Sequence, residues 1–225
     1  MRTMRRITFL ALALAAIGGC DFDNFAPPQS ELTGRVVFDG QTVNVRQNAV
    51  QLELWQDGYE LSDPIPLHVS QEGTFAAMLF DGAYKLVRKQ NNGPWVNNAD
   101  TIRIEVRGSL DLDVPVQPFF TIANATITRD GTVLTGSFDL EQVVAEREVE
   151  RLALYVGTTR FVDSRYNALG VEQEADNSAL EGVNTLTVDL AALLQSEEHL
   201  FARMGVKTVG VEEMIYTPVE EIATQ

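Results

Sequence analysis

The sequence predicts an all-β protein built from two consecutive β-sandwiches. Apolar and polar residues alternate over short runs, which is the pattern of strands with one buried face and one wet face. Two of the four Asp-Gly pairs, Asp81-Gly82 and Asp130-Gly131, lie between two such runs and are strong hairpin signals. No segment shows the long apolar period of an amphipathic helix, and many short strands between turns are typical of sandwiches.

The first sandwich is predicted over residues 31–117. Its opening run of alternating residues ends at Asp39-Gly40, which predicts a turn. His68 lies in another alternating run, and we expect it to be an ordinary strand residue. The predicted strands are residues 32–38, 50–55, 66–69, 74–80, 83–89, 102–106 and 110–116.

The second sandwich is predicted over residues 118–225. Pro115 and Pro118 mark the boundary, because two prolines in four residues interrupt a sheet ladder. The number of strands is that of an immunoglobulin-like or fibronectin-type sandwich, here without the cysteine pair of antibody domains. Predicted strands are residues 119–129, 132–140, 149–157, 185–190, 200–209 and 214–222.

Three connections of the second sandwich are less regular. Residues 191–198 are predicted to form a short helical turn, and residues 140–149 to hold a turn or two of helix. The polar stretch 158–183 is predicted to be a long connection with a strand near Phe161. Long loops on a rigid sandwich are where function is usually placed.

Residues 1–19 have the three parts of a secretory signal peptide: a basic start, a short apolar run and small residues at the cut. Cys20, the only cysteine, follows Ile17-Gly18-Gly19 in a pattern that resembles the lipobox of bacterial lipoproteins. The resemblance implies cleavage before Cys20 and acylation of its thiol and amino group, with residues 20–30 as a lipidated tether. The alternative is an unlipidated secreted protein cut near Gly19. The apolar run is too short for a transmembrane helix.

The charge and composition exclude several classes of function. Loss of the signal segment removes three arginines and no acid, which changes the net charge from −15 to −18. A body this acidic repels nucleic acid and anionic membrane surfaces. With two histidines, His68 and His199, and no cysteine beyond Cys20, we predict no zinc site, and no other metal or cofactor is predicted. The sequence contains no nucleophile elbow, phosphate-binding loop or dinucleotide fingerprint, so we predict no catalytic residue.

One loop has the composition of a sugar-binding site. Residues 91–98 place Trp95 among four asparagine amides, with Asn92 and Asn97 as the nearest candidates. An indole stacks on the C–H face of a sugar, and amides donate and accept hydrogen bonds with its hydroxyls. The alternative is that Trp95 folds back and caps the core, because asparagine and glycine suit any loop.

Trp55 and Tyr59 are the other two candidate ligand-binding residues. They flank a Gln-Asp-Gly turn, and we expect them to lie at the same end of the first sandwich as the tryptophan of the 91–98 loop. Together the five side chains would form a glycan-binding surface.

The order of several short motifs resembles a family of two-domain lipoproteins of unknown function. These are encoded in Bacteroidetes loci for polysaccharide uptake, beside TonB-dependent receptors and SusD-like proteins. The similarity covers nearly the whole chain after the signal segment. The matching motifs include Leu32-Thr33-Gly34-Arg35, Leu54-Trp55-Gln56-Asp57-Gly58-Tyr59, Gly93-Pro94-Trp95, Val114-Pro115-Val116-Gln117-Pro118 and Tyr216-Thr217-Pro218-Val219.

The resemblance implies a transthyretin-like, carboxypeptidase-regulatory-like first sandwich and a fibronectin III or immunoglobulin-like second one. It also implies an outer-membrane location, and Asp21 and Asp23 after the anchor resemble export signals of lipoproteins that face the cell exterior. We therefore expect a non-enzymatic surface lipoprotein that assists glycan capture and binds a polysaccharide. The alternative is a structural or docking subunit of a TonB-receptor and SusD-like complex, or an adhesin-like module, without sugar affinity. A hydrolase with a shallow carboxylate site is a further alternative.

Overall fold

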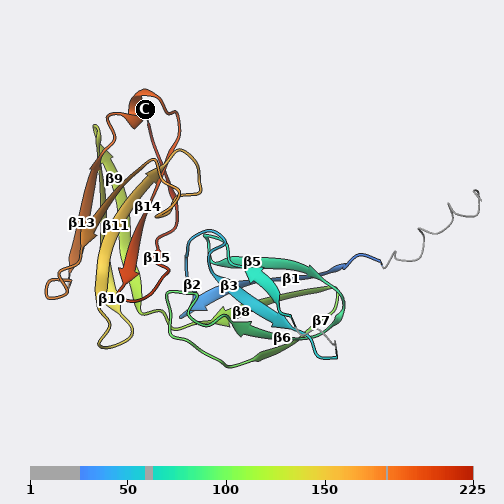
Figure 1. The fold of residues 1–225 in the computed structure, drawn as a ribbon. Coiled ribbons are helices and arrows are strands. Elements are labelled where there is room, and N and C mark those ends of the chain that lie inside the picture. The colour runs from blue at the N-terminus through green and yellow to red at the C-terminus, as the bar shows by residue number, and fades with distance from the viewer. Residues whose placement is uncertain (1–25, 59–62, 181, 225) are drawn as a thin grey trace, which may run out of the picture.

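The computed structural model describes residues 26–58, 63–180 and 182–224, and it confirms two all-β sandwiches (Figure 1). The predicted signal peptide, Cys20 and Tyr59 lie outside the described residues. Among the residues that are described, no helix is long and apolar enough to span a membrane. The strands of the first sandwich are β1 (Ser30–Phe38), β2 (Gln41–Thr42), β3 (Gln51–Trp55), β4 (Ile65–His68), β5 (Thr74–Leu79), β6 (Gly82–Arg88), β7 (Ile102–Val106) and β8 (Ser109–Pro115).

Two four-stranded sheets form the first sandwich. One has the antiparallel order β4-β3-β6-β7, and the other joins β2, β1 and β5, with β8 parallel to β1. The predicted alternation is present in β3, where Leu52 and Leu54 are fully buried while Glu53 and Trp55 lie on the outer face. At the end of β1, Asp39 and Gly40 both have positive φ, as a tight two-residue hairpin requires.

The second sandwich packs a sheet of order β13-β10-β9 against a sheet of order β12-β11-β14-β15, with β16 also paired to β14. These orders correspond to the A-B-E and C-F-G pairings of an immunoglobulin-like sandwich. Its elements are β9 (Phe120–Asp130), β10 (Val133–Gln142), β11 (Val149–Gly157), β12 (Leu169–Glu174), β13 (Val183–Asp189), the 3-10 helix η1 (Leu193–Gln195), β14 (Leu200–Thr208), β15 (Ile215–Tyr216) and β16 (Glu220–Ile222).

The hairpins predicted at Asp81-Gly82 and Asp130-Gly131 have different outcomes. Gly131, with φ of 57°, closes the predicted hairpin between β9 and β10. The hairpin predicted at Asp81-Gly82 is wrong, because β5 and β6 lie in opposite sheets. The pair instead forms a corner between the sheets, where the Asp81 carboxylate accepts hydrogen bonds from the Ser30 hydroxyl and the Gly108 N–H.

Two expectations for the connections of the second sandwich are also wrong. No strand forms at Phe161; the strand of this segment is β12, which begins at Leu169 and pairs with β11. Residues 140–149 hold no helix, because β10 continues to Gln142 and bends and turns lead into β11. The helical turn predicted within 191–198 is present as η1.

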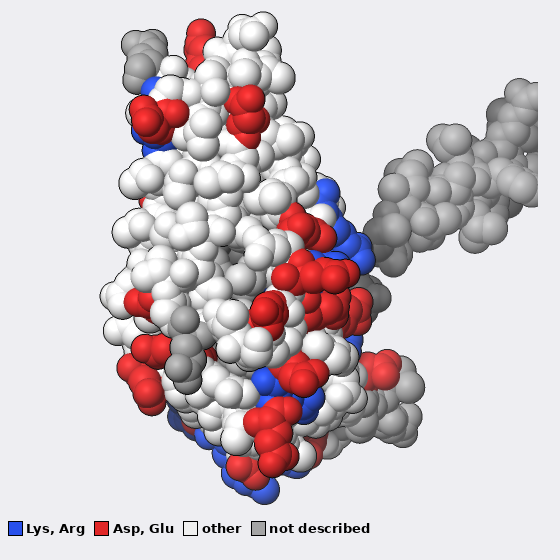
Figure 2. Space-filling model, turned by 90° about the vertical axis from the view of Figure 1, so that its left-hand side faces the viewer, with Lys and Arg blue, Asp and Glu red and all other residues white. Residues whose placement is uncertain are grey.

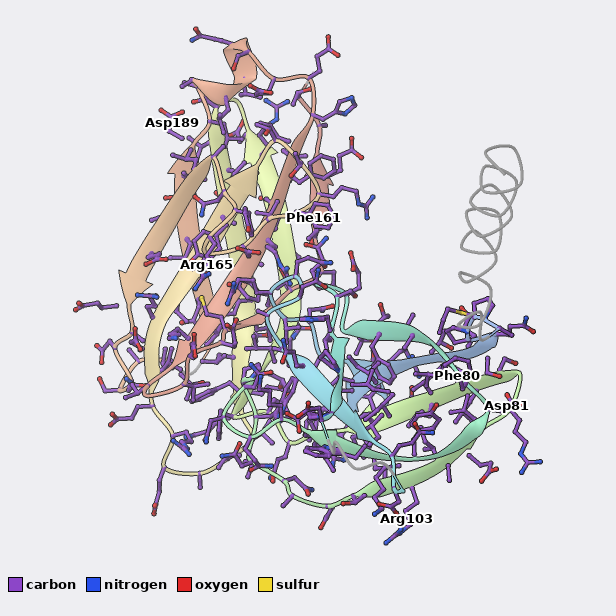
Figure 3. All side chains as sticks on the ribbon, turned by 45° about the vertical axis from the view of Figure 1, so that its right-hand side comes forward. Phe80, Asp81, Arg103, Phe161, Arg165 and Asp189 are labelled. Carbon is purple, nitrogen blue, oxygen red and sulfur yellow. The ribbon has the colours of Figure 1, made fainter. Side chains whose placement is uncertain are left out.

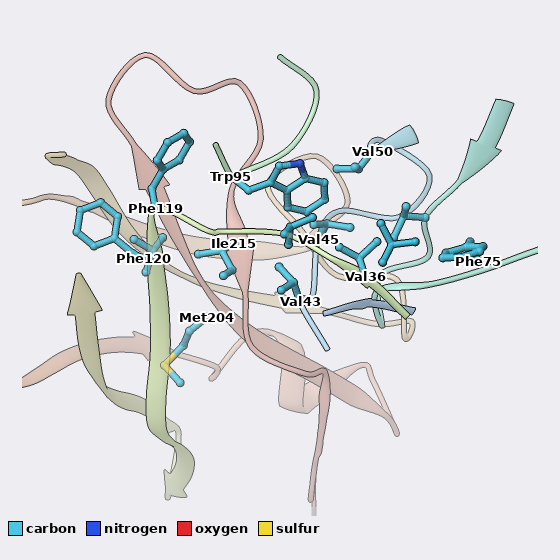
Figure 4. Packing of buried hydrophobic residues seen from close by; sticks show 14 of the residues in the cluster. Val36, Val43, Val45, Val50, Phe75, Trp95, Phe119, Phe120, Met204 and Ile215 are labelled. Carbon is cyan, nitrogen blue, oxygen red and sulfur yellow. The ribbon is translucent and has the colours of Figure 1, made fainter. Parts of the chain in front are cut away.

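The two sandwiches share an interface of polar and apolar contacts. Asn44 of the first pairs with Tyr216 of the second in an antiparallel bridge, and the Tyr216 N–H donates to the Asn44 carbonyl at 3.1 Å. Beside this bridge, Arg46 forms a bidentate ion pair with Glu213 that is largely buried. Apolar side chains of both sandwiches belong to one continuous buried cluster, part of which is seen in Figure 4. The sandwiches are therefore joined by more than their short linker.

The buried Arg203 of β14 adds a further polar contact across this interface. Its guanidinium donates to the Thr217 carbonyl at 3.1 Å and to the Val45 and Val162 carbonyls at 3.3 Å each. It also lies over the ring of Tyr216, with 4.2 Å from Cζ to the ring centroid. Burial lowers the pKa of Arg203 to about 10, so the guanidinium remains charged at neutral pH.

Candidate functional site

The strongest candidate site lies on the outer face of the β4-β3-β6-β7 sheet. The strand register pairs Trp55 with Lys85 and Lys85 with Arg103, so the three residues form one row across β3, β6 and β7. Neighbouring strands are about 4.8 Å apart, so the side chains of such a row on one face are within reach of their neighbours. The row places an aromatic ring and two cations together on a rigid sheet.

A hollow of about 510 Å³ surrounds this row. The Lys85 ammonium forms an ion pair with Asp57 at 2.6 Å, between Nζ and Oδ1. The indole N–H of Trp55 donates to Glu53 at 3.3 Å, between Nε1 and Oε2, which links the ring to its own strand. Trp55 is only partly buried, and Arg103 is exposed. Figure 3 shows Arg103 projecting from the first sandwich into solvent.

Trp95, the centre of the predicted sugar-binding loop, is instead a core residue. Its side chain is 4% exposed and belongs to the buried cluster that also contains Val45 and Val50 (Figure 4). A Cβ on Gly93 would come within 2.3 Å of the indole, so this position has no room for any larger residue. A small hollow of about 290 Å³ adjoins the loop, but the ring itself has almost no exposed face on which a sugar could stack.

The asparagines of the same loop bond within the protein. The Asn92 side chain accepts from the Gln51 N–H at 2.6 Å and donates to the Ala49 carbonyl at 3.2 Å. The Asn97 amide donates to the Asn91 side chain at 2.6 Å and accepts from the Asn91 N–H at 2.7 Å. These bonds fix the loop and occupy the groups that were expected to meet sugar hydroxyls.

Trp55 and the Trp95 loop do not share one end of the sandwich, contrary to the expectation. Asn92 is bonded to Gln51 at the start of β3, whereas Trp55 ends that strand. Four residue steps of a strand span about 13 Å. The structure therefore separates the predicted surface into a loop whose tryptophan is buried and a distinct hollow around Trp55.

Comparison with protein families shows that both domains of the chain match one two-domain family. The N-terminal domain of a family described as "Protein of unknown function (DUF3823)" matches residues 30–117, and its C-terminal domain, "Domain of unknown function (DUF3823_C)", matches residues 120–221. The chain belongs to the DUF3823 family. No curated protein matches it.

Solved DUF3823 structures share the whole two-domain arrangement. A protein from Parabacteroides merdae is 36% identical, with a TM-score of 0.81 over 87% of this chain and 99% of that one. A protein from Bacteroides ovatus is 33% identical, with a TM-score of 0.80 over 88% of this chain and 100% of that one.

A more distant structure, from Bacteroides uniformis, is described as a "putative carbohydrate binding protein". It is 17% identical, with a TM-score of 0.70 over 87% of this chain and 99% of that one, and at this identity the likeness shows the fold alone.

The DUF3823 C-terminal domain presents a second exposed feature, the loop of residues 158–168. Asp163 is fully buried within it, and its Oδ1 accepts from the backbone N–H groups of Arg165 at 2.7 Å and Tyr166 at 2.9 Å. The buried Val162 packs beneath the loop, and its carbonyl accepts from Arg203. The loop is thus braced from below by the second sandwich.

The outer side of this loop is aromatic and basic. Phe161 is 54% exposed and Tyr166 is 62% exposed, and the adjacent Arg160 and Arg165 are exposed as well. In Figure 3, Phe161 lies at the edge of the second sandwich, and the first sandwich is below it. The sequence held a signal for this surface, namely two aromatic residues in a polar stretch without strand alternation.

Acidic groups dominate much of the remaining charged surface of this DUF3823 protein. On the face seen in Figure 2, Asp and Glu side chains gather in a broad cluster on one flank. Among the residues described, no three His, Cys, Asp or Glu side chains are grouped so that they could hold a metal ion.

Proposed function

We propose that this protein is a non-enzymatic, lipid-anchored accessory protein of the cell surface that binds a glycan at the Trp55 hollow. The row of Trp55, Lys85 and Arg103 on the outer face of one sheet is the observation that supports it. A partly exposed indole offers an apolar ring for the C–H face of a sugar. The charged groups around it offer donors and acceptors for hydroxyls, held by rigid strands rather than by a loop.

The position of the hollow fits a protein that is tethered through Cys20. Ser30, where the chain enters β1, is bonded to the Asp81-Gly82 corner from which β6 starts. Lys85 follows three residues later on β6, about 10 Å along the strand. The hollow is therefore at the end of the body from which the tether leaves, which would hold a captured glycan near the membrane and near an uptake complex within it.

A glycan array tests this proposal with the two-domain body, residues 26–225, which is close to the 87% of the chain that the P. merdae structure matches. A hit is then titrated by calorimetry against Trp55→Ala and Phe80→Ala. Phe80 is the matched control, because it is a 55% exposed aromatic residue of the same domain outside the hollow.

Trp55→Ala is expected to weaken binding at least tenfold, about 1.4 kcal/mol, whereas Phe80→Ala leaves it unchanged. An array without any hit, on a sample whose fold is verified by circular dichroism, contradicts the proposal. Incubation of the body with bound glycans is expected to yield no new reducing ends, and their appearance would contradict a non-enzymatic role.

The exposed loop of residues 158–168 favours a second candidate function, docking to a TonB-dependent receptor or SusD-like protein. Exposed aromatic residues beside arginines are typical of the residues that dominate protein interfaces. Membrane co-purification of the lipidated protein with such a partner, lost in Phe161→Ser/Tyr166→Ser, supports docking. Retention of the partner by this double variant argues against the loop as the docking surface.

A further inference from the structure

We infer that the glycan recognised at the Trp55 hollow is anionic, and that Arg103 reads its oxyanion, a uronate carboxylate or a sulfate ester. This inference rests on the proposed function, since it names the substrate class of the same site. The exposed Arg103, in the same hollow as the partly buried Trp55, carries it.

Among the described residues, three of the four charged groups that line the hollow are already paired. Lys85 is held by Asp57 at 2.6 Å, and the carboxylate of Glu105 accepts two hydrogen bonds from Arg107, at 2.8 and 3.0 Å. In the part of the chain that the structure describes, Arg103 has neither an ion pair nor a hydrogen bond with another residue. The four charges of the lining sum to zero, and Arg103 is the one among them that has no partner in the described part of the chain.

The neighbouring carboxylate of Glu53 is not paired with Arg103 among the described residues. It lies outside the lining of the hollow and accepts the indole N–H of Trp55. Its cross-strand partner is the uncharged Val87, one row away from Arg103 along the strands. Glu53 thus orients the ring and leaves the guanidinium free for a ligand.

An unpaired guanidinium preferentially binds planar or tetrahedral oxyanions such as carboxylates and sulfates. Its planar fork of N–H donors matches the two oxygens of a carboxylate or sulfate in a bidentate contact. The whole chain has a net charge of −15, so an anionic ligand is repelled at long range and needs such a local cation to bind. An exposed, unpaired arginine beside a stacking ring supplies this contact.

The distance along the row also sets the minimum length of the ligand. Arg103 is two strands away from Trp55, which corresponds to about 10 Å. That span exceeds one sugar ring, so a sugar stacked on Trp55 would present the oxyanion of the next sugar to Arg103. The site is thus suited to an oligosaccharide rather than to a monosaccharide.

The experiment measures binding of matched acidic and neutral oligosaccharides to the two-domain body by calorimetry. One arm uses uronate tetrasaccharides and their methyl esters, and the other uses sulfated tetrasaccharides and their desulfated forms. Each is titrated against wild type, Arg103→Gln and Arg129→Gln, an arginine of β9 in the second domain that serves as the matched control.

The expected result is that at least one acidic form binds ten times more tightly than its neutral partner, and the arm in which this occurs identifies the oxyanion. Arg103→Gln is expected to abolish this preference while the affinity for the neutral form stays within twofold, and Arg129→Gln is expected to keep the preference. Equal binding of acidic and neutral forms, or a preference that survives Arg103→Gln, overturns the inference and leaves glycan binding in place. Absence of binding in every arm, together with an array without hits, overturns both.

Discussion

The two tryptophans are expected to respond in opposite ways to truncation. Trp95 is 4% exposed, so Trp95→Ala removes a large buried side chain from the shared core and leaves a cavity. Such substitutions cost about 3–5 kcal/mol, which for a chain of this size lowers the melting temperature by roughly 10 °C. Trp55 is only partly buried on an outer sheet face, and Trp55→Ala is expected to change the free energy of unfolding by about 1 kcal/mol or less.

Urea unfolding followed by far-ultraviolet circular dichroism measures both effects without relying on indole fluorescence. Sugar affinity, measured on the folded fraction at low temperature, completes the comparison: we expect Trp95→Ala to keep it and Trp55→Ala to lose it. A Trp95→Ala variant that is as stable as wild type, or that stays folded but no longer binds sugar, would refute the assignment of Trp95 to the core and of Trp55 to the site.

Three further predictions concern the contacts that hold the body together. Arg203→Met removes three hydrogen bonds to backbone carbonyls, one of them across the interface, and should lower the free energy of unfolding by about 2–4 kcal/mol; an unchanged urea midpoint would contradict this. Glu213→Gln leaves the Arg46 guanidinium largely buried without its partner and should cost about 3 kcal/mol, whereas adding Arg46→Met should recover part of the loss in a double-mutant cycle. Ser30→Ala removes the hydroxyl that, as the main cause, lowers the pKa of Asp81. A carboxyl whose pKa is lowered in the folded state stabilises the fold above its unfolded pKa of about 4, and this contribution is lost as the pH falls. Ser30→Ala should therefore destabilise more at pH 7 than near pH 2, where only the loss of the hydroxyl as acceptor for the Gly108 N–H remains; parallel stability curves would contradict this.

Local patterns predicted the strands well because each depends on neighbouring residues. The alternation that buries Leu52 and Leu54 also places Trp55 on the outer face, so its exposure follows from the sequence. The hairpin at Asp130-Gly131 formed for the same reason, since its two strands are adjacent in both chain and sheet. At Asp81-Gly82 the same signal failed, because the following strand finds its partners in the other sheet.

The site was harder to predict because it depends on contacts between distant segments. Lys85 and Arg103 join Trp55 only through the register of three strands, which no local pattern specifies. Trp95 lies in an irregular loop, where it is buried in a cluster with apolar residues of other elements and pairs in an antiparallel bridge with Pro118 beyond the domain boundary. Asparagines near it looked like ligand groups, although they fold the loop by bonding to the backbone and to each other.

The most direct test of glycan binding at the Trp55 hollow is a nuclear magnetic resonance titration of the indole N–H signals. The chain has two tryptophans, so two such signals are expected, and Trp55→Phe assigns them. During titration with an oligosaccharide hit, the Trp55 signal is expected to shift with saturation while the Trp95 signal stays in place. A shift confined to Trp95, or no shift of either signal at saturating sugar, would contradict glycan binding at this hollow.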